Sequence, residues 1–267
     1  MRLMTWNINS LRLRLPLLQR LGEEQAPDII CLQETKVPDA LFPADPLREL
    51  GYDHQHFLGM KGYNGVAILS RHPIRPIEAT PDWCGKSDTR HIGVVIDTTT
   101  GPVMLHDFYV PAGGDIPDPA VNDKFAHKLA FLDEVTAWFR ENPPIRSIVV
   151  GDLNIAPLEH DVWSHKQLST VVSHTPPEIE RLNAWVATGF VDAMRLVVPP
   201  QEKLYTWWSY RNRDWKLSNR GRRLDHVWMT PDLQPALTNL NVLRDVRDWD
   251  SPSDHVPVVF DLDLSAA

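Results

Sequence analysis

Cysteine is scarce in this sequence, and long apolar runs and low-complexity segments are absent. The only cysteines, Cys31 and Cys84, lie in or beside apolar context, which excludes a disulfide framework and favours a reduced cytosolic protein. No apolar stretch approaches the roughly 20 residues of a membrane span, and the N-terminus turns polar too soon for a signal peptide. We therefore expect a cytoplasmic protein with no membrane partner.

No linker divides the chain. Its 267 residues are 43% hydrophobic and 23% charged, which is enough to bury a sizeable core. A chain of 267 residues can form one large domain or two, but no Ser/Gly tract interrupts the apolar segments, and the 23 prolines are spread through turns. We predict a single domain over residues 1–267, acting as a monomer.

Short strands outnumber helices among the predicted elements. Helices are expected after Pro16, over residues 122–140 and over residues 177–188. Runs rich in β-branched residues predict strands at 3–8, 28–32, 66–70, 92–97, 103–110, 147–150, 205–208, 225–229 and 256–262. This pattern favours sheets that pack on each other and are covered outside by helices. The similar segments 3–9 and 148–154, which both run from an apolar strand to Asn, also suggest a duplicated half.

Polar signatures that suit one hydrolytic metal site stand at the ends of these apolar runs. Side chains at the ends of neighbouring strands converge, so together they can supply a metal ligand, a water activator and a pair that positions a proton. The signatures are Asn7, Gln33-Glu34-Thr35, Tyr109, Gly151-Asp152-Leu153-Asn154, Leu224-Asp225-His226 and Ser253-Asp254-His255. No single signature would support the conclusion.

The acidic signatures also have simpler interpretations. Glu34 beside Asn7 is sufficient to hold Mg²⁺, but a Glu at a strand end can instead cap a helix or pair with Lys36. Asp152 and Asn154 can face one side and activate a water, although Gly-Asp-Leu-Asn is as often a turn. Their joint occurrence with the other signatures favours catalysis.

A histidine and an aspartate complete the predicted site. Asp225 can orient His255, which then holds or protonates a phosphoryl oxygen. An isolated Asp-His dipeptide is more often a loop, and the chain has 11 histidines.

The order of these motifs resembles that of a known enzyme family. Further parts of the pattern are Trp6-Asn7-Ile8-Asn9, Gly62-Tyr63-Asn64-Gly65, Tyr109-Val110-Pro111 and Tyr205-Thr206-Trp207-Trp208. Nearly end to end, the chain resembles the exodeoxyribonuclease III family of abasic-site DNA repair nucleases, within the endonuclease/exonuclease/phosphatase superfamily. The resemblance implies an α/β fold, a four-layer α/β/β/α sandwich with two central mixed β-sheets like that of deoxyribonuclease I.

The resemblance also implies an activity and its cofactor. The expected enzyme is a Mg²⁺-dependent phosphodiesterase of base excision repair, with Mn²⁺ as a substitute. It would act on double-stranded DNA as a 3′–5′ exonuclease, as an endonuclease cutting 5′ to abasic sites, and as a phosphatase or phosphodiesterase at blocked 3′ ends. The number of metals and the identity of the general base stay open.

Roles follow from the resemblance position by position. Asn7 and Glu34 would bind the metal, with Asp254 assisting through water. The metal site would also include Asp152, Asn154 and His255. Tyr109, Asn154 and His255 would contact the scissile phosphate, Asp152 would activate the water, and Asp225 would orient His255. The residues expected to contact DNA are Tyr63, Arg90, Trp207, Arg213, Lys216, Arg222 and Leu224.

A basic segment supports the nucleic-acid interpretation. Residues 203–223 carry seven basic side chains against one acidic residue, Asp214, with three tryptophans interleaved. The alternative is a solvated loop over core tryptophans. The formal net charge of −8 argues against indiscriminate binding of polyanions.

Two departures from the family pattern affect the substrate. Ala112 stands where Asn or Gln is common, and Arg222 stands where the wall of the abasic-sugar pocket is usually apolar. They leave the balance between exonuclease and endonuclease activity open. Two other hypotheses remain, namely a hydrolase of phosphoinositide, sphingomyelin or RNA, and a catalytically inactive DNA-binding scaffold.

Overall fold

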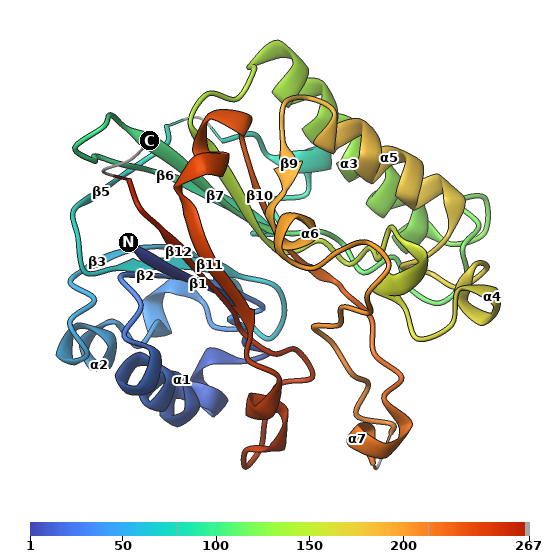
Figure 1. Ribbon diagram of the computed structural model, residues 1–267, viewed down its shortest axis with the longest axis horizontal. Helices are drawn as coiled ribbons and strands as arrows, with labels where there is room; N and C mark the ends of the chain where they lie inside the picture. Colours follow the sequence, from blue (N-terminus) through green and yellow to red (C-terminus); the bar gives the residue numbers. More distant parts are fainter. Residues whose placement is uncertain (79, 213, 265–267) are drawn as a thin grey trace.

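Two mixed sheets of six strands form the centre of the molecule, and helices cover both outer sides (Figure 1). The computed structural model describes residues 1–78, 80–212 and 214–264. The first sheet has the order β11 (Leu237–Val242), β12 (Val258–Leu262), β1 (Arg2–Asn7), β2 (Ile29–Gln33), β4 (Val66–Ser70), β3 (His54–Leu58). The second has the order β5 (Ile74–Pro76), β6 (His91–Ile96), β7 (Val103–Tyr109), β8 (Ser147–Asp152), β10 (Asp225–Met229), β9 (Val191–Asp192).

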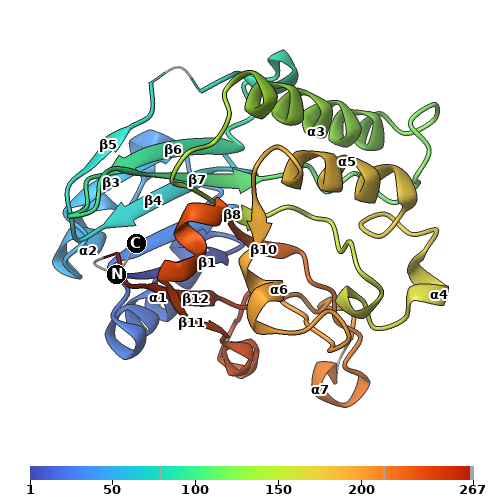
Figure 2. The same ribbon diagram turned by 45° about the horizontal axis from the view of Figure 1, so that its top comes forward.

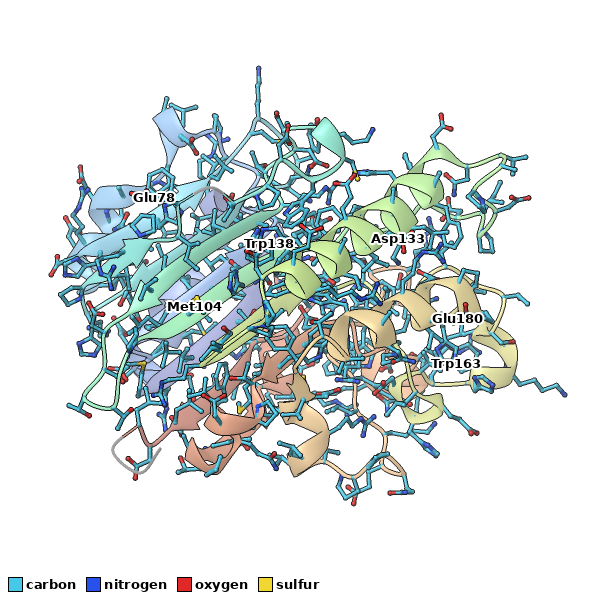
Figure 3. The ribbon with its side chains drawn as sticks, turned by 90° about the horizontal axis from the view of Figure 1, so that it is seen from above. Glu78, Met104, Asp133, Trp138, Trp163 and Glu180 are labelled. Carbon is cyan, nitrogen blue, oxygen red and sulfur yellow. The ribbon has the colours of Figure 1, made fainter. Side chains whose placement is uncertain are left out.

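The helices lie outside the sheets. Their bounds are α1 (Leu11–Gln25), α2 (Ala44–Glu49), α3 (Asp123–Glu141), α4 (His165–Leu168), α5 (Pro176–Val186), α6 (Ala193–Val197) and α7 (Trp215–Ser218). In Figure 1, α1 and α2 flank the first sheet, and α3 and α5 flank the second. Seen from above, α3 and α5 lie across the second sheet, with the exposed Asp133 and Glu180 on them (Figure 3).

Alternation of side chains along the strands builds the layers. In β1, Met4 and Trp6 pack towards α1, while Leu3 joins the core between the sheets. In the second sheet, Phe108 and Val149 pack under α3 and α5. The predicted four-layer α/β/β/α sandwich is therefore confirmed.

The two sheets repeat one topology. In each, the central pair of strands is parallel and joined by a long helix, β1 to β2 through α1 and β7 to β8 through α3, and the other neighbours are antiparallel. The first repeat combines both ends of the chain, which lie together where the Met1 amino group donates to the Leu262 carbonyl at 2.8 Å (Figure 2). Thus β1 corresponds to β7 and β2 to β8, so segments 3–9 and 148–154 are not the equivalent pair that their sequences suggested.

Some predicted elements were wrong or incomplete. Residues 205–208 form no strand, since Trp207 makes only isolated bridges, to Arg222 on one side and to His255 on the other. Strands β3, β5, β9 and β11 and the short helices α2, α4, α6 and α7 were not predicted, because elements this short leave little periodicity in the sequence. Among the described helices, none has the length and apolar composition needed to cross a membrane.

Candidate active site

The repeated topology brings equivalent strand ends from both sheets to one place. Asn7 ends β1 and Tyr109 ends the corresponding β7, while Glu34 follows β2 and Asp152 ends the corresponding β8. The Asn7 amide Nδ2 donates to the Asp152 Oδ2 at 2.8 Å, which joins the sheets at this edge. The convergence predicted from the polar signatures is therefore present.

Asn7 links two carboxylates through hydrogen bonds. Its Nδ2 also donates to Glu34 Oε1 at 2.9 Å, while its Oδ1 accepts the backbone N–H of Asn9 at 3.1 Å. Glu34 leaves β2 with φ of 51°, a left-handed conformation that is costly for a residue with a Cβ. Its Oε2 lies 2.8 Å from the Lys36 ammonium, so the simpler ion-pair interpretation is also realised.

Asp152 and Asn154 form a tight turn at the end of β8. The Asn154 backbone N–H donates to Asp152 Oδ1 at 2.9 Å, and its Nδ2 donates to Asp152 Oδ2 at 3.2 Å. Asn154 Nδ2 also donates to the Val110 carbonyl at 2.9 Å. The turn therefore aims both side chains at the site and does not compete with the catalytic interpretation.

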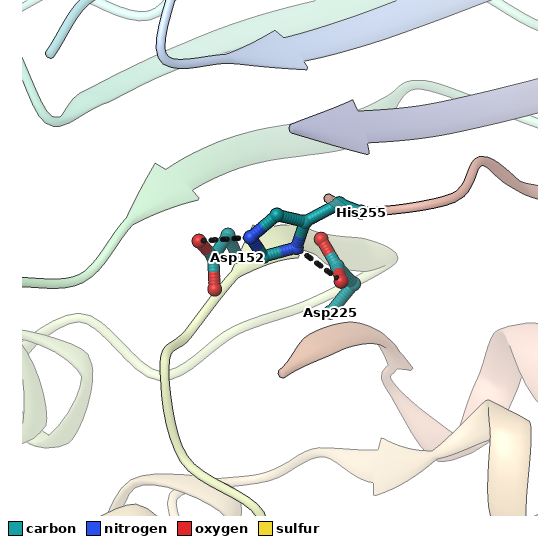
Figure 4. Close-up of side chains that lie close together, drawn as sticks. All are labelled: Asp152, Asp225 and His255. Carbon is teal, nitrogen blue, oxygen red and sulfur yellow. Dashed lines mark hydrogen bonds and ion pairs between the residues drawn. The ribbon is translucent and has the colours of Figure 1, made fainter. Parts of the chain in front are cut away.

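Asp225 and Asp152 lie on opposite sides of the His255 ring (Figure 4). Asp225 Oδ2 lies 2.8 Å from Nδ1 of His255, and Asp152 Oδ2 lies 3.6 Å from Nε2. Burial lowers the pKa of His255, but Asp225, and then Asp152, outweigh it and raise that pKa to about 10. Burial raises the pKa of Asp152 to about 7, although His255 opposes this shift. Near neutral pH the imidazole is therefore protonated while Asp152 titrates.

Maintaining the geometry around His255 and Asp225 falls to motif residues that were given no catalytic role in the sequence analysis. Ser253 Oγ donates to the Asn7 carbonyl at 2.7 Å, and Trp6 Nε1 donates to the His255 carbonyl at 3.1 Å. Thr206 Oγ1 accepts the backbone N–H groups of Leu224 and Asp225, each at 3.1 Å. The segment predicted as a strand at 205–208 thus fixes Asp225 from the side.

Tyr109 and Arg90 form one wall of the site. Burial, followed by Glu34 and Asp152, raises the pKa of the Tyr109 hydroxyl well above its usual range, so it remains a hydrogen-bond donor. The Arg90 guanidinium lies 4.9 Å from the Tyr109 ring centroid and pairs with Asp88. Arg90 was expected to contact DNA, but these contacts bury most of its side chain.

Trp207, Leu224 and Arg222 stand on the other side of His255. Trp207 Nε1 donates to Asp254 Oδ2 at 2.9 Å, and Asn9 Nδ2 donates to Asp254 Oδ1, also at 2.9 Å. Leu224 is buried in a small apolar cluster against which Trp207 packs. Arg222 lies with its guanidinium 5.4 Å from the Trp207 ring centroid.

The remaining residues expected to contact DNA lie at the surface. Tyr63 is 54% exposed, and Lys216 lies exposed on α7, where it pairs with Asp248. Trp208 and Trp215 belong to the core, so the basic segment does cover buried tryptophans. Arg213 lies outside the described residues.

Sequence reasoning missed two buried ion pairs behind the site. The fully buried Lys128 Nζ lies 2.5 Å from Glu178 Oε2, and it donates to the Asn154 carbonyl at 2.8 Å and the Ala112 carbonyl at 3.4 Å. Arg223 is equally buried and bonds both oxygens of Asp161. A lysine within the apolar stripe of α3 was the available signal for the first pair.

Carboxylates outnumber cations in the site. The ligand atoms of Asp152, Asp225 and His255 lie within 4.8 Å of one another, and Asp225 Oδ1 has no hydrogen-bond partner among the described residues. Glu34 and Asp254 add further negative charge, and Lys36 and protonated His255 are the cations in direct contact with these groups among the described residues. A divalent cation would balance this charge, so the donor set fits a metal.

Comparison with known proteins agrees with this geometry. A family model described as the endonuclease/exonuclease/phosphatase family matches residues 4–255, so the chain belongs to that family. It is 28% identical to exodeoxyribonuclease III of Haemophilus influenzae, over 97% of this chain and 98% of that protein.

Solved structures match the whole fold. The 3′ phosphatase NExo from Neisseria, bound to a product DNA hairpin, is 30% identical with a TM-score of 0.88, covering 98% of this chain and 99% of that one. An AP endonuclease from Archaeoglobus fulgidus is 30% identical with a TM-score of 0.89, covering 99% and 100%. Within its family, the chain groups with exodeoxyribonuclease III and the AP endonucleases, and it is a nuclease of the hydrolase class.

Proposed function

We propose that the protein is a Mg²⁺-dependent DNA repair phosphodiesterase that acts on duplex DNA as a monomer of one domain. Its reactions would be 3′–5′ exonuclease activity, incision 5′ to abasic sites, and removal of 3′-blocking groups. The observation that carries the proposal is the His255 ring between Asp225 and Asp152, with Asn7 linking Asp152 to Glu34. The similarity to a DNA-bound 3′ phosphatase and to an AP endonuclease supports the choice of substrate.

The side chains divide the chemistry among them. Asp152, with a pKa of about 7, takes a proton from the attacking water. Protonated His255, fixed by Asp225, donates to a phosphoryl oxygen, and Tyr109 donates to the same phosphate. Asn154 would contact this phosphate by exchanging the longer of its two Nδ2 hydrogen bonds, the one to Asp152 at 3.2 Å, for a phosphoryl oxygen. Hydrogen bonds from Asn7 Nδ2 fix the positions of the Asp152 and Glu34 carboxylates relative to each other.

Glu34 is the residue best placed to hold the cation, with Asp254 assisting through water. When bound, Mg²⁺ would act as a Lewis acid that stabilises negative charge on the phosphoryl group. Mn²⁺ accepts the same oxygen ligands and would substitute. Asn7 Nδ2 orients both carboxylates, and Asn7 Oδ1, which accepts only the backbone N–H of Asn9 among the described residues, keeps a second lone pair with which it would bind the cation.

The test uses three duplexes, each with Mg²⁺: one with an internal abasic site, one blunt and undamaged, and one ending in a 3′-phosphate. Product lengths separate incision from resection, and released inorganic phosphate reports the phosphatase. Glu34→Ala should raise the Mg²⁺ concentration needed for half-maximal activity at least about tenfold, because it removes a charged ligand. Glu180→Ala, at an exposed position on α5, is the matched control. Full activity in excess EDTA would reject the metal.

A further inference from the structure

Arg222 is a half-buried cation without an acidic partner. Its Nη1 donates to the Val172 carbonyl at 3.0 Å and to Ser173 Oγ at 2.7 Å. Within the described ranges, no ion pair includes Arg222, and the nearby Glu178 is already engaged by Lys128. Burying an unpaired charge is unfavourable, so an anion from outside the chain is the partner that this arrangement lacks.

The backbone places Arg222 in a row with the catalytic histidine. Trp207 forms antiparallel bridges to Arg222 on one side and to His255 on the other. Directly opposed residues of antiparallel segments project to the same face, and adjacent segments lie about 4.8 Å apart. Arg222 therefore shares a face with His255, about 10 Å away across the Trp207 ring.

The Arg222 guanidinium keeps N–H donors that are not used within the described part of the protein. Val172 and Ser173 hold Nη1, whereas no protein acceptor within the described residues bonds Nε or Nη2. The guanidinium also lies 5.4 Å from the Trp207 ring centroid, within range of a cation–π interaction. A guanidinium held in this way is suited to a carboxylate or a phosphate, which it can bind with two parallel hydrogen bonds.

We propose that Arg222, supported by Trp207 and Ser173, is a subsite for an anionic group attached to the scissile phosphate. This inference rests on the proposed function and names its substrate class, namely phosphodiesters whose group beyond the scissile bond carries a carboxylate or a second phosphate. Water attacks the phosphorus and the P–O3′ bond breaks. The DNA leaves with a 3′-hydroxyl after taking a proton, and the fragment keeps the phosphate.

The experiment compares matched pairs of duplexes that differ only in this anionic group. One pair ends in 3′-phosphoglycolate or in 3′-phosphoglycolamide, in which an uncharged amide replaces the carboxylate on the same phosphodiester. The other pair carries an internal tetrahydrofuran whose next linkage is a phosphodiester or an uncharged methylphosphonate. For each pair the readout is the ratio of kcat/KM between the charged and the uncharged member.

Arg222→Met should lower at least one of these ratios by about 10-fold to 100-fold, the usual effect of losing a charge-assisted hydrogen bond. A fall in the first ratio identifies a carboxylate ligand, and a fall in the second identifies the next phosphate. Arg222→Lys keeps the charge but loses the two parallel N–H donors, so it should lower the same ratio by a smaller factor. It replaces Arg222→Met in the test if that variant does not fold.

Arg220→Met is the matched control. Arg220 lies two residues away and stacks on Trp163 at 4.7 Å, outside the row of bridges, so its loss should leave both ratios unchanged. Ratios within about twofold of the wild type in Arg222→Met would overturn the subsite, given the magnitude above. A wild-type protein that cleaves no member of either pair would reject the proposed function itself.

Discussion

The interaction between Asp225 and His255 makes a quantitative prediction about pH. Asp225 is the largest of the contributions that raise the pKa of His255 to about 10. At pH 8 the wild-type ring is therefore about 99% protonated, by the ordinary titration relation. Asp225→Asn keeps the size of the side chain but removes its charge. In this variant burial lowers the pKa of His255 while Asp152 raises it.

The expected loss follows from the reference value of a histidine. If the pKa returns to about 6.5, only about 3% of the rings stay protonated at pH 8, so kcat falls about 30-fold from charge alone. At pH 6 about three quarters remain protonated, and this part of the loss is less than about twofold. The ratio of wild-type to variant kcat should therefore rise steeply with pH.

The assay measures kcat on a 3′-phosphate duplex from pH 6 to pH 9 at constant ionic strength and saturating Mg²⁺. Asp232→Asn removes an exposed aspartate in the turn before β11, and its ratio to wild type should stay flat. A ratio for Asp225→Asn that is large but independent of pH would refute the reasoning, because Asp225 would then act only through geometry.

Three further predictions concern catalysis and stability. Asp152→Asn should lower kcat at least about 10²-fold while DNA affinity measured by fluorescence anisotropy changes little, and near-native turnover would remove Asp152 as the base. Lys128→Met leaves Glu178 charged and buried, so urea titration should show a loss of about 3–5 kcal/mol. Adding Glu178→Gln, which removes the charge but keeps a carbonyl oxygen for the backbone N–H groups of Ser173 and Thr175, should recover most of it. Burial lowers the pKa of His106 to about 4, below an unfolded value of about 6.5, so the unfolded state binds more protons between these values. His106 alone should therefore lower the free energy of unfolding by up to about 3 kcal/mol as pH drops through this range. His106→Gln should remove that share and leave the share of other buried histidines such as His226.

The residues that we propose as catalytic could be singled out in the sequence because their signals are local. Asp152 and Asn154 follow an apolar strand directly, and a strand end must turn where its polar residues begin. Glu34 directly follows β2, and His255 precedes the apolar run that contains β12. The order of these motifs also identified the family correctly, and with it the four layers.

The residues behind the site could not be predicted in the same way. Lys128 is buried because Glu178, fifty positions further along the chain, meets it from α5. Gln33 was recognised as part of a motif, but its Nε2 donates to Asp107 at 2.6 Å, a contact between the two sheets. Such partners depend on which helices and sheets pack together, and no local pattern specifies that.

The sequence by itself determined which side chains we propose for the chemistry, since each of them lies at or beside the end of an apolar strand. Only the tertiary structure decided how they are combined. Folding both ends of the chain into one repeat places β1 and β2 against β7 and β8, and this brings Asn7 to Asp152. It also turned residues 205–208, whose apolar pattern predicted a strand, into a bridge between Arg222 and His255. Hydrogen bonds between distant segments outweigh local propensity there, because buried backbone groups must find partners wherever the fold supplies them.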